Sequence, residues 1–251
     1  MQKRLEICCY SMESALVAQK QGAYRIELCD NYSEGGTTPS LATIQYAVNE
    51  LDIPVNVIVR PRGGDFLYSD LEYEIMKLEV KMIKSLNVNG IVIGFLTSDG
   101  DIDVSKMSEI VKLAKPMEVT FHRAFDMCRD PFIALEQLIE IGVTRILTSG
   151  GKNKATEGLD LITSLVHKAH NRIIIMPGSG VSEQNLKEVI IKTNATEFHS
   201  SAKMFTPSNM NYFNKSITMG GQNSIDEYSK ISVNPNSIRK MVEILHEFNC
   251  L

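Results

Sequence analysis

The sequence predicts an α/β protein folded as a (β/α)8 TIM barrel, followed by a C-terminal tail helix. Three observations support this. Eight short runs rich in apolar and β-branched residues recur along the chain, and segments with helical apolar spacing separate them. The length of 251 residues is that of a typical barrel. An open doubly wound sheet is the alternative, but the first strand-to-helix turn lacks the G-x-G-x-x-G fingerprint of such sheets.

The predicted strands are strand-sized apolar runs bounded by turn residues. A right-handed crossover joins each consecutive pair of parallel strands, so eight strand–helix units close into a barrel. The strands are expected at Leu5–Cys9, Arg25–Cys29, Val55–Arg60, Gly90–Phe95, Glu118–His122, Arg145–Ser149, Ile173–Met176 and Glu197–Ser201.

Helices are predicted between the strands. Capping residues place helix starts near Ser40, Pro131 and Ser182. The clearest helical spacing follows the third strand, at Leu71, Ile75, Leu78, Met82 and Ile83.

The chain is expected to form a single domain. Residues 1–203 supply the barrel, and residues 204–251 form a C-terminal extension packed on it. Within the extension, Asn, Ser and Gly dominate Ser208–Ser224, which predicts an irregular segment. Asn236–Phe248 is predicted to be a helix with its apolar residues on one face.

Composition excludes several partners. The net charge is -4 and the isoelectric point is near 5.8, with no basic run, so nucleic acid is not an expected partner. Apolar stretches such as Ile173–Met176 fall far short of the ~20 residues of a membrane span, so no membrane partner is expected. Five scattered cysteines and no secretory signal indicate free thiols in the cytoplasm.

The inward faces of the strands are unusually polar. Alternation within each strand sends one set of side chains into the barrel. The polar members of that set are Glu6, Cys8, Glu27, Cys29, Asn56, Arg60, Glu118, Thr120, His122, Glu197 and His199. Buried charges need partners, so one interpretation is a structural ion-pair network, such as Glu27 with Arg60. The other is a site whose carboxylates and histidines have shifted pKa values for acid–base chemistry.

The loops after the strands contain glycines and hydroxyl groups suited to an anion. Small residues allow backbone N–H groups to approach closely, and the loops after strands 7 and 8 form the usual phosphate site of barrels. The alternative is that these glycines only make tight turns. The candidate anion-binding residues are Arg62, Ser149, Gly150, Gly178, Ser179, Gly180, His199 and Ser201.

Two inward cysteines form a candidate metal site. In the predicted register Glu6 lies opposite Glu27 and Cys8 lies opposite Cys29. Neighbouring strands are about 4.8 Å apart, so two thiolates at one depth can share a soft ion such as Cu(I). The alternative is that both cysteines are small core residues.

Long ordered strings along the chain resemble the CutC family, the copper homeostasis proteins. The strings are RIELC at Arg25–Cys29, EGGTTPS at Glu34–Ser40, RPRGGDF at Arg60–Phe66, TFHRAFD at Thr120–Asp126, LTSG at Leu147–Gly150, MPGSG at Met176–Gly180 and EFH at Glu197–His199. The resemblance runs from Leu5 to about Lys203, and Met219-Gly220 in the tail also fits it.

The resemblance implies a cytoplasmic TIM barrel that forms homo-oligomers and is linked to copper tolerance and Cu(I) binding. Cys8 and Cys29 match the cysteines proposed as copper ligands in that family, whereas Cys9 lies outside the pattern.

Three hypotheses about function follow. The first is a copper-handling protein that binds Cu(I) through Cys8 and Cys29. The second is an enzyme acting on a small anionic, for example phosphorylated, metabolite, without an organic cofactor. In it Glu27 or His122 is the acid–base group, the anion is held by Arg60, Arg62 and Arg123, and a phosphate is cradled by Gly150, Gly178 and Gly180. The third is a non-catalytic barrel that senses an anion.

Overall fold

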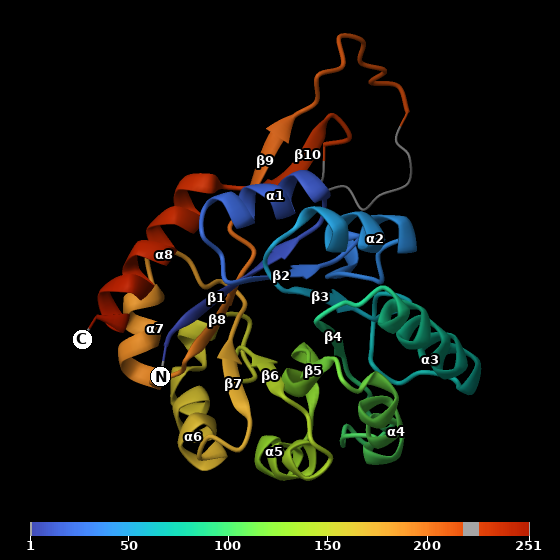
Figure 1. Cartoon of the computed structure of the whole chain (residues 1–251), viewed down its shortest axis with the longest axis vertical. Helices are drawn as coiled ribbons and strands as arrows, with labels where there is room; N and C mark the ends of the chain where they lie inside the picture. Colours follow the sequence, from blue (N-terminus) through green and yellow to red (C-terminus); the bar gives the residue numbers. More distant parts are fainter. Residues whose placement is uncertain (1, 218–225, 251) are drawn as a thin grey trace.

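A computed structural model describes residues 2–217 and 226–250. In this part of the chain, eight parallel strands run in the order β7-β6-β5-β4-β3-β2-β1-β8, and β7 and β8 are neighbours where the barrel closes (Figure 1). The TIM-barrel prediction is confirmed. The strands are β1 Arg4–Cys9, β2 Arg25–Leu28, β3 Val55–Ile58, β4 Gly90–Ile93, β5 Glu118–Phe121, β6 Arg145–Thr148, β7 Ile174–Pro177 and β8 Glu197–Ser200. Met219-Gly220 lies outside the described residues.

Seven helices follow strands of the barrel. They are α1 Met12–Lys20, α2 Leu41–Glu50, α3 Asp70–Ser85, α4 Val104–Ala114, α5 Pro131–Glu140, α6 Leu159–Ala169 and α7 Leu186–Thr193. None of the helices in the described ranges is both long and apolar enough to span a bilayer.

The predicted helix starts at Ser40 and Pro131 are confirmed. The Ser40 hydroxyl accepts the Thr43 N–H, and Pro131 is the first residue of α5. The predicted start at Ser182 is wrong, because α7 begins at Leu186. The side chain of Asn185 bonds back to the Ser182 N–H and the Gly180 carbonyl, which closes a turn before the helix can begin.

Helix α3 lies where predicted, but its buried face differs from the predicted apolar stripe. A capping box between Ser69 and Glu72 starts the helix. Of the five apolar residues that predicted this helix, only Ile83 is buried, and the buried face also includes Tyr73, Met76 and Val80. The others remain exposed on the outside of the barrel, at Leu71, Ile75, Leu78 and Met82.

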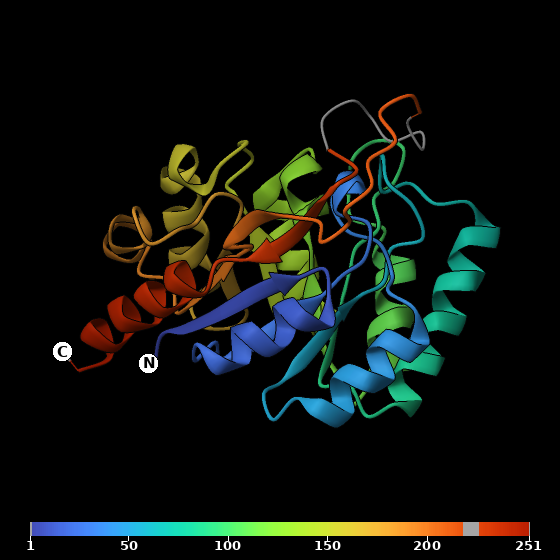
Figure 2. The same ribbon diagram turned by 90° about the horizontal axis from the view of Figure 1, so that it is seen from above.

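After the barrel, an antiparallel pair of strands leads to a final helix. The strands are β9 Lys203–Pro207 and β10 Ser229–Val233, and this pairing was not predicted. The predicted helix Asn236–Phe248 is confirmed as α8, Pro235–Asn249. Figure 2 shows α8 beside β1 and α1, and it also contacts α7.

The register between β1 and β2 corrects the predicted one. Cys8 lies opposite Glu27, and Glu6 lies opposite Arg25, so the predicted pairing is wrong by two residues. A shift of two residues keeps every side chain on its face, so alternation cannot detect it. The stagger between neighbouring strands is instead set by closure of the whole barrel.

A buried ion network fills part of the barrel interior. Arg25 contacts Glu6 and lies 2.7 Å from Glu197. Arg145 lies 2.5 Å from Glu197 and 3.1 Å from Glu118. Burial alone would raise the pKa of Glu197, but Arg145 and Arg25 outweigh it and lower that pKa. Glu197 is therefore a carboxylate shared by two buried cations, each of which also contacts a second carboxylate, Glu6 or Glu118.

Glu197→Gln should destabilise the fold by about 3–5 kcal/mol, because it leaves two buried guanidinium groups without their shared counter-charge. Urea unfolding at neutral pH measures this loss. The matched control is Glu136→Gln, which removes an equally direct but exposed pair with Arg172 and should leave the midpoint essentially unchanged. Equal midpoints for the two variants would contradict the role assigned to the network.

Candidate functional site

A cavity of about 650 Å³ opens at the carboxyl ends of the barrel strands. Strands β1, β2, β3, β6 and β8 and the loops after the strands supply its walls. The structure brings together in this lining a large part of the candidate set, namely Cys8, Glu27, Arg60, His122, Arg123, Ser179, Gly180, His199 and Ser201.

Five candidate residues do not line the cavity, namely Cys29, Arg62, Ser149, Gly150 and Gly178. Arg62 turns outward, where it lies 2.6 Å from Glu72 and donates to the Leu67 carbonyl. The Ser149 hydroxyl and N–H both donate to Asp126. These polar groups already have protein partners and are poorly placed to hold a ligand in this cavity.

Gly150 and Gly178, the two candidate glycines outside the lining, lie where neighbouring atoms leave little room for a side chain. Gly150 has φ +71°, and a Cβ there would lie 2.3 Å from the carbonyl oxygen of Gly158. A Cβ on Gly178 would lie 2.4 Å from Leu147. The structure therefore supports the simpler explanation for both positions, that they fit tight turns and close contacts.

The candidate set omits several residues of the lining, among them Tyr10, Tyr32, Phe66 and Lys154. Tyr10 lies two residues after Cys8, so alternation could have found it. Lys154 and Phe66 lie in loops, where no periodic signal exists. The ring of Phe66 packs under both the guanidinium of Arg60 and the imidazole of His122.

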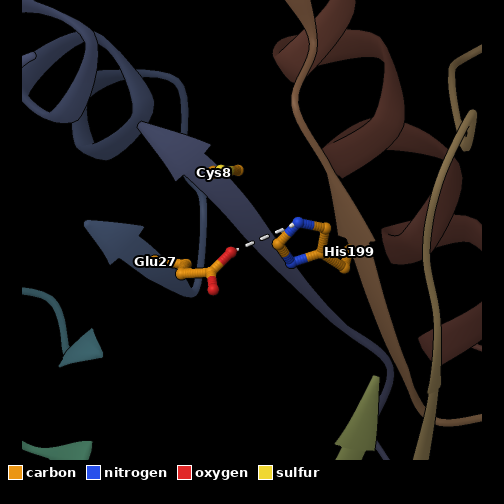
Figure 3. A group of neighbouring side chains, drawn as sticks. All are labelled: Cys8, Glu27 and His199. Atoms are coloured by element: carbon orange, nitrogen blue, oxygen red, sulfur yellow. Dashed lines mark ion pairs between the residues drawn. The ribbon is translucent and has the colours of Figure 1, made fainter. Parts of the chain in front are cut away.

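The mutual geometry of five buried groups defines the deepest part of the site. The Nδ1 atom of His199 lies 2.9 Å from Glu6 Oε1. Its Nε2 atom lies 3.5 Å from Glu27 Oε2 (Figure 3). On the other side, the sulfur atoms of Cys8 and Cys29 are 3.6 Å apart. The predicted pair of Glu27 with Arg60 is wrong, because Arg60 instead donates to three backbone carbonyls, of Glu34, Gly36 and Gly64.

Neighbouring groups in this cluster have pKa values moved in opposite directions. The hydrogen bond with Cys29 is the largest influence on Cys8 and lowers the pKa of its thiol. Burial, followed by the negative charge on Cys8, raises the pKa of Glu27 well above its usual value. Burial alone would lower the pKa of His199, but hydrogen bonds with Cys8 and Glu6 raise it. The cluster therefore favours a thiolate beside a protonated imidazole.

His122 is a neutral hydrogen-bond donor at the edge of the cavity. Its Nδ1 atom accepts the Ala124 N–H at 3.2 Å, so the ring proton belongs on Nε2. Burial and then the charge of Arg60 lower the pKa of His122 to about 3. Neither Nε2 of His122 nor Nε of Arg60 has a hydrogen-bond partner within the described residues. Two residues of the cavity lining thus each carry a buried N–H donor that has no protein partner in this part of the chain.

Fold and site together define a class. This is a (β/α)8-barrel protein with a mixed-charge cavity at the carboxyl ends of its strands and a buried pair of thiols beneath it. The CutC family model matches residues 3–204, and the chain belongs to the CutC family.

Relatives are similar in sequence to this chain along almost its whole length. A family protein CutC from Parabacteroides distasonis is 47% identical, covering 96% of this chain and 100% of that one. The human copper homeostasis protein cutC homolog is 48% identical, covering 90% of this chain and 82% of the human one. The crystal structure of CutC from Streptococcus agalactiae superposes with a TM-score of 0.76 at 35% identity, covering 79% of this chain and 98% of that one.

The lowered pKa of His122 predicts a specific loss of stability in mild acid. Below pH 6.5 the unfolded chain binds a proton at this histidine, whereas the folded chain does so only near pH 3. Relative to His122→Gln, the wild-type free energy of unfolding should therefore fall by about 1.4 kcal/mol per pH unit from pH 6.5 toward pH 5. Urea unfolding of both proteins at several pH values measures this. Parallel curves would show that His122 is not held neutral.

Proposed function

We propose that this protein handles copper, binding Cu(I) between the thiolates of Cys8 and Cys29. The observation that carries the proposal is the pair of buried, unbridged sulfur atoms 3.6 Å apart. Thiolates are the soft ligands that Cu(I) prefers. The names of relatives at 47–48% identity, which refer to CutC and to copper homeostasis, support the same function.

The two thiols differ in a way that suits uptake of a metal ion. Cys8 lines the cavity and has a lowered pKa, so it can meet an incoming ion as a thiolate. Burial and its hydrogen bond with Cys8 raise the pKa of Cys29, so Cys29 gives up its proton only when the ion arrives. Copper is the cargo in this proposal, passed through the open cavity.

Location and assembly form part of the same proposal. A cytoplasmic location is supported by five free cysteines, since a reducing compartment keeps neighbouring thiols from forming a disulfide. Homo-oligomerisation is supported by the exposed apolar stripe on α3, formed by Leu71, Ile75, Leu78 and Met82. Light scattering at micromolar protein tests the assembly, and a monomer would exclude it.

A second candidate function is supported by the unpartnered donors of the cavity. Arg60 and His122 offer N–H groups without protein partners, and Arg123, Lys154 and Lys203 add positive charge to the lining. A small anionic metabolite fits such a cavity, either as the substrate of an enzyme or as the ligand of a sensor. In the enzyme, His122 and Arg60 stabilise developing negative charge, because a histidine held neutral is a donor rather than a base near pH 7.

Cys8→Ser and Cys29→Ser should each lose tight Cu(I) binding, because two-coordinate thiolate binding needs both sulfur atoms. Competition with a Cu(I) chelator under anaerobic conditions measures the affinity. Cys128→Ser and Cys250→Ser serve as controls, since neither residue belongs to the buried pair of thiols. Unchanged affinity in either Cys8→Ser or Cys29→Ser would contradict the copper site.

Inorganic phosphate should bind in the cavity, and Lys154→Gln should weaken that binding several-fold by removing one positive charge from the lining. Isothermal titration calorimetry measures the affinity. The matched control is Lys152→Gln, which changes a lysine of the same loop that lies outside this lining. Equal affinities in the two variants would place any bound phosphate elsewhere.

A further inference from the structure

Three different metal-ligating groups converge at the floor of the cavity. The sulfur of Cys8, a carboxylate oxygen of Glu27 and a ring nitrogen of His199 all lie within 4.8 Å of one another (Figure 3). Each residue is buried, and each comes from a different strand, namely β1, β2 and β8. Because the three strands are hydrogen-bonded neighbours, the backbone fixes these positions without help from a flexible loop.

One distance in this group matches the ligand spacing of a small tetrahedral ion, and all three ligand atoms lie within 4.8 Å of one another. Protein ligands of zinc lie at about 2.0–2.3 Å, which separates any two of them by roughly 3.3–3.7 Å. The measured distance from His199 Nε2 to Glu27 Oε2 is 3.5 Å. Cys29 is not a member of this group, although its sulfur lies next to that of Cys8.

A further carboxylate holds the histidine in the orientation that a metal site requires. Glu6 Oε1 lies 2.9 Å from His199 Nδ1, so this contact places a proton on Nδ1 and directs Nε2 toward Glu27. Glu6 is itself held by Arg25 through its other oxygen. A metal-ligating histidine almost always has such a carboxylate or carbonyl partner at its second nitrogen.

We propose that Cys8, Glu27 and His199 bind one divalent transition-metal ion of the Zn²⁺ class, with Glu6 orienting His199. One thiolate, one imidazole and one carboxylate form a mixed set of the kind zinc accepts, whereas Cu(I) prefers thiolates alone. This site goes beyond the proposed copper function and shares only Cys8 with it.

The fourth coordination position of this ion faces the cavity. All three ligands belong to the lining, together with Arg60 and Lys154. Three protein ligands plus an open position distinguish catalytic zinc sites from structural ones, which use four protein ligands. Water or a small anion therefore completes the coordination from the cavity side.

Titration of the metal-free full-length protein with Co²⁺ tests the proposal, because Co²⁺ substitutes for Zn²⁺ and absorbs visible light. We expect one equivalent of Co²⁺ to give thiolate charge-transfer and four-coordinate d–d bands that Zn²⁺ then removes. Cys8→Ser should abolish the charge-transfer band, and Glu27→Gln and His199→Gln should weaken binding at least about tenfold. Cys29→Ser should retain both the band and the affinity.

Circular dichroism checks that each variant is folded, and Cys8→Ser and Cys29→Ser are matched substitutions of neighbouring buried thiols. The proposal is overturned if the wild-type protein shows no Co²⁺ bands, or if His199→Gln binds Co²⁺ as the wild type does. It is also overturned if Cys29→Ser loses the bands, since the ion then sits between the two sulfurs. Cu(I) competition on the same variants is a separate measurement, so failure of the copper site leaves a positive Co²⁺ result standing.

Discussion

The rest of the structure depends on the two buried ion pairs of the Arg25 guanidinium group. It lies inside the barrel between the carboxylates of Glu6 and Glu197. An isolated charge at this depth would be strongly unfavourable, so the cation and its two partners have to be held together. Glu197 continues the network to Arg145, and Glu6 continues it to His199. The ion network of the core is therefore continuous with the candidate site.

This continuity explains why the charges of the site differ so sharply over short distances. Arg25 lowers the pKa of Glu6 against the opposing effect of burial, so Glu6 is a carboxylate that favours a proton on the neighbouring His199. Among the described residues, Glu27 has no cation as close as Arg25 is to Glu6, and burial raises the pKa of Glu27 instead. Two carboxyl groups of one barrel thus hold their protons with very different affinities, which is how sites separate acid and base roles.

The cavity has two chemically different ends. Its floor, at Cys8, Glu27 and His199, offers soft and hard ligand atoms on rigid strands. Its upper wall, at Arg60 and His122, offers hydrogen-bond donors that have no protein partner in the described ranges. A copper carrier needs only the two thiols as metal ligands, and the N–H donors of Arg60 and His122 would not contribute to Cu(I) binding. Their presence is the structural reason for considering a small anionic molecule alongside a metal ion.

The sequence by itself determined the barrel and the faces of its strands, because apolar periodicity and side-chain alternation are local properties of the chain. Alternation alone placed Glu27, His122 and His199 inside the barrel. The tertiary structure decided the register of β1 against β2, because a shift of two residues leaves alternation unchanged and only barrel closure selects it.

The tertiary structure also decided which charged and polar groups contact one another. Arg25 rather than Arg60 meets the inward carboxylates, and the loop after β7 ends in a turn at Asn185 instead of a helix at Ser182. Such choices depend on which groups the closed barrel brings within hydrogen-bonding distance. That distance is a property of the whole fold, and no stretch of sequence contains it.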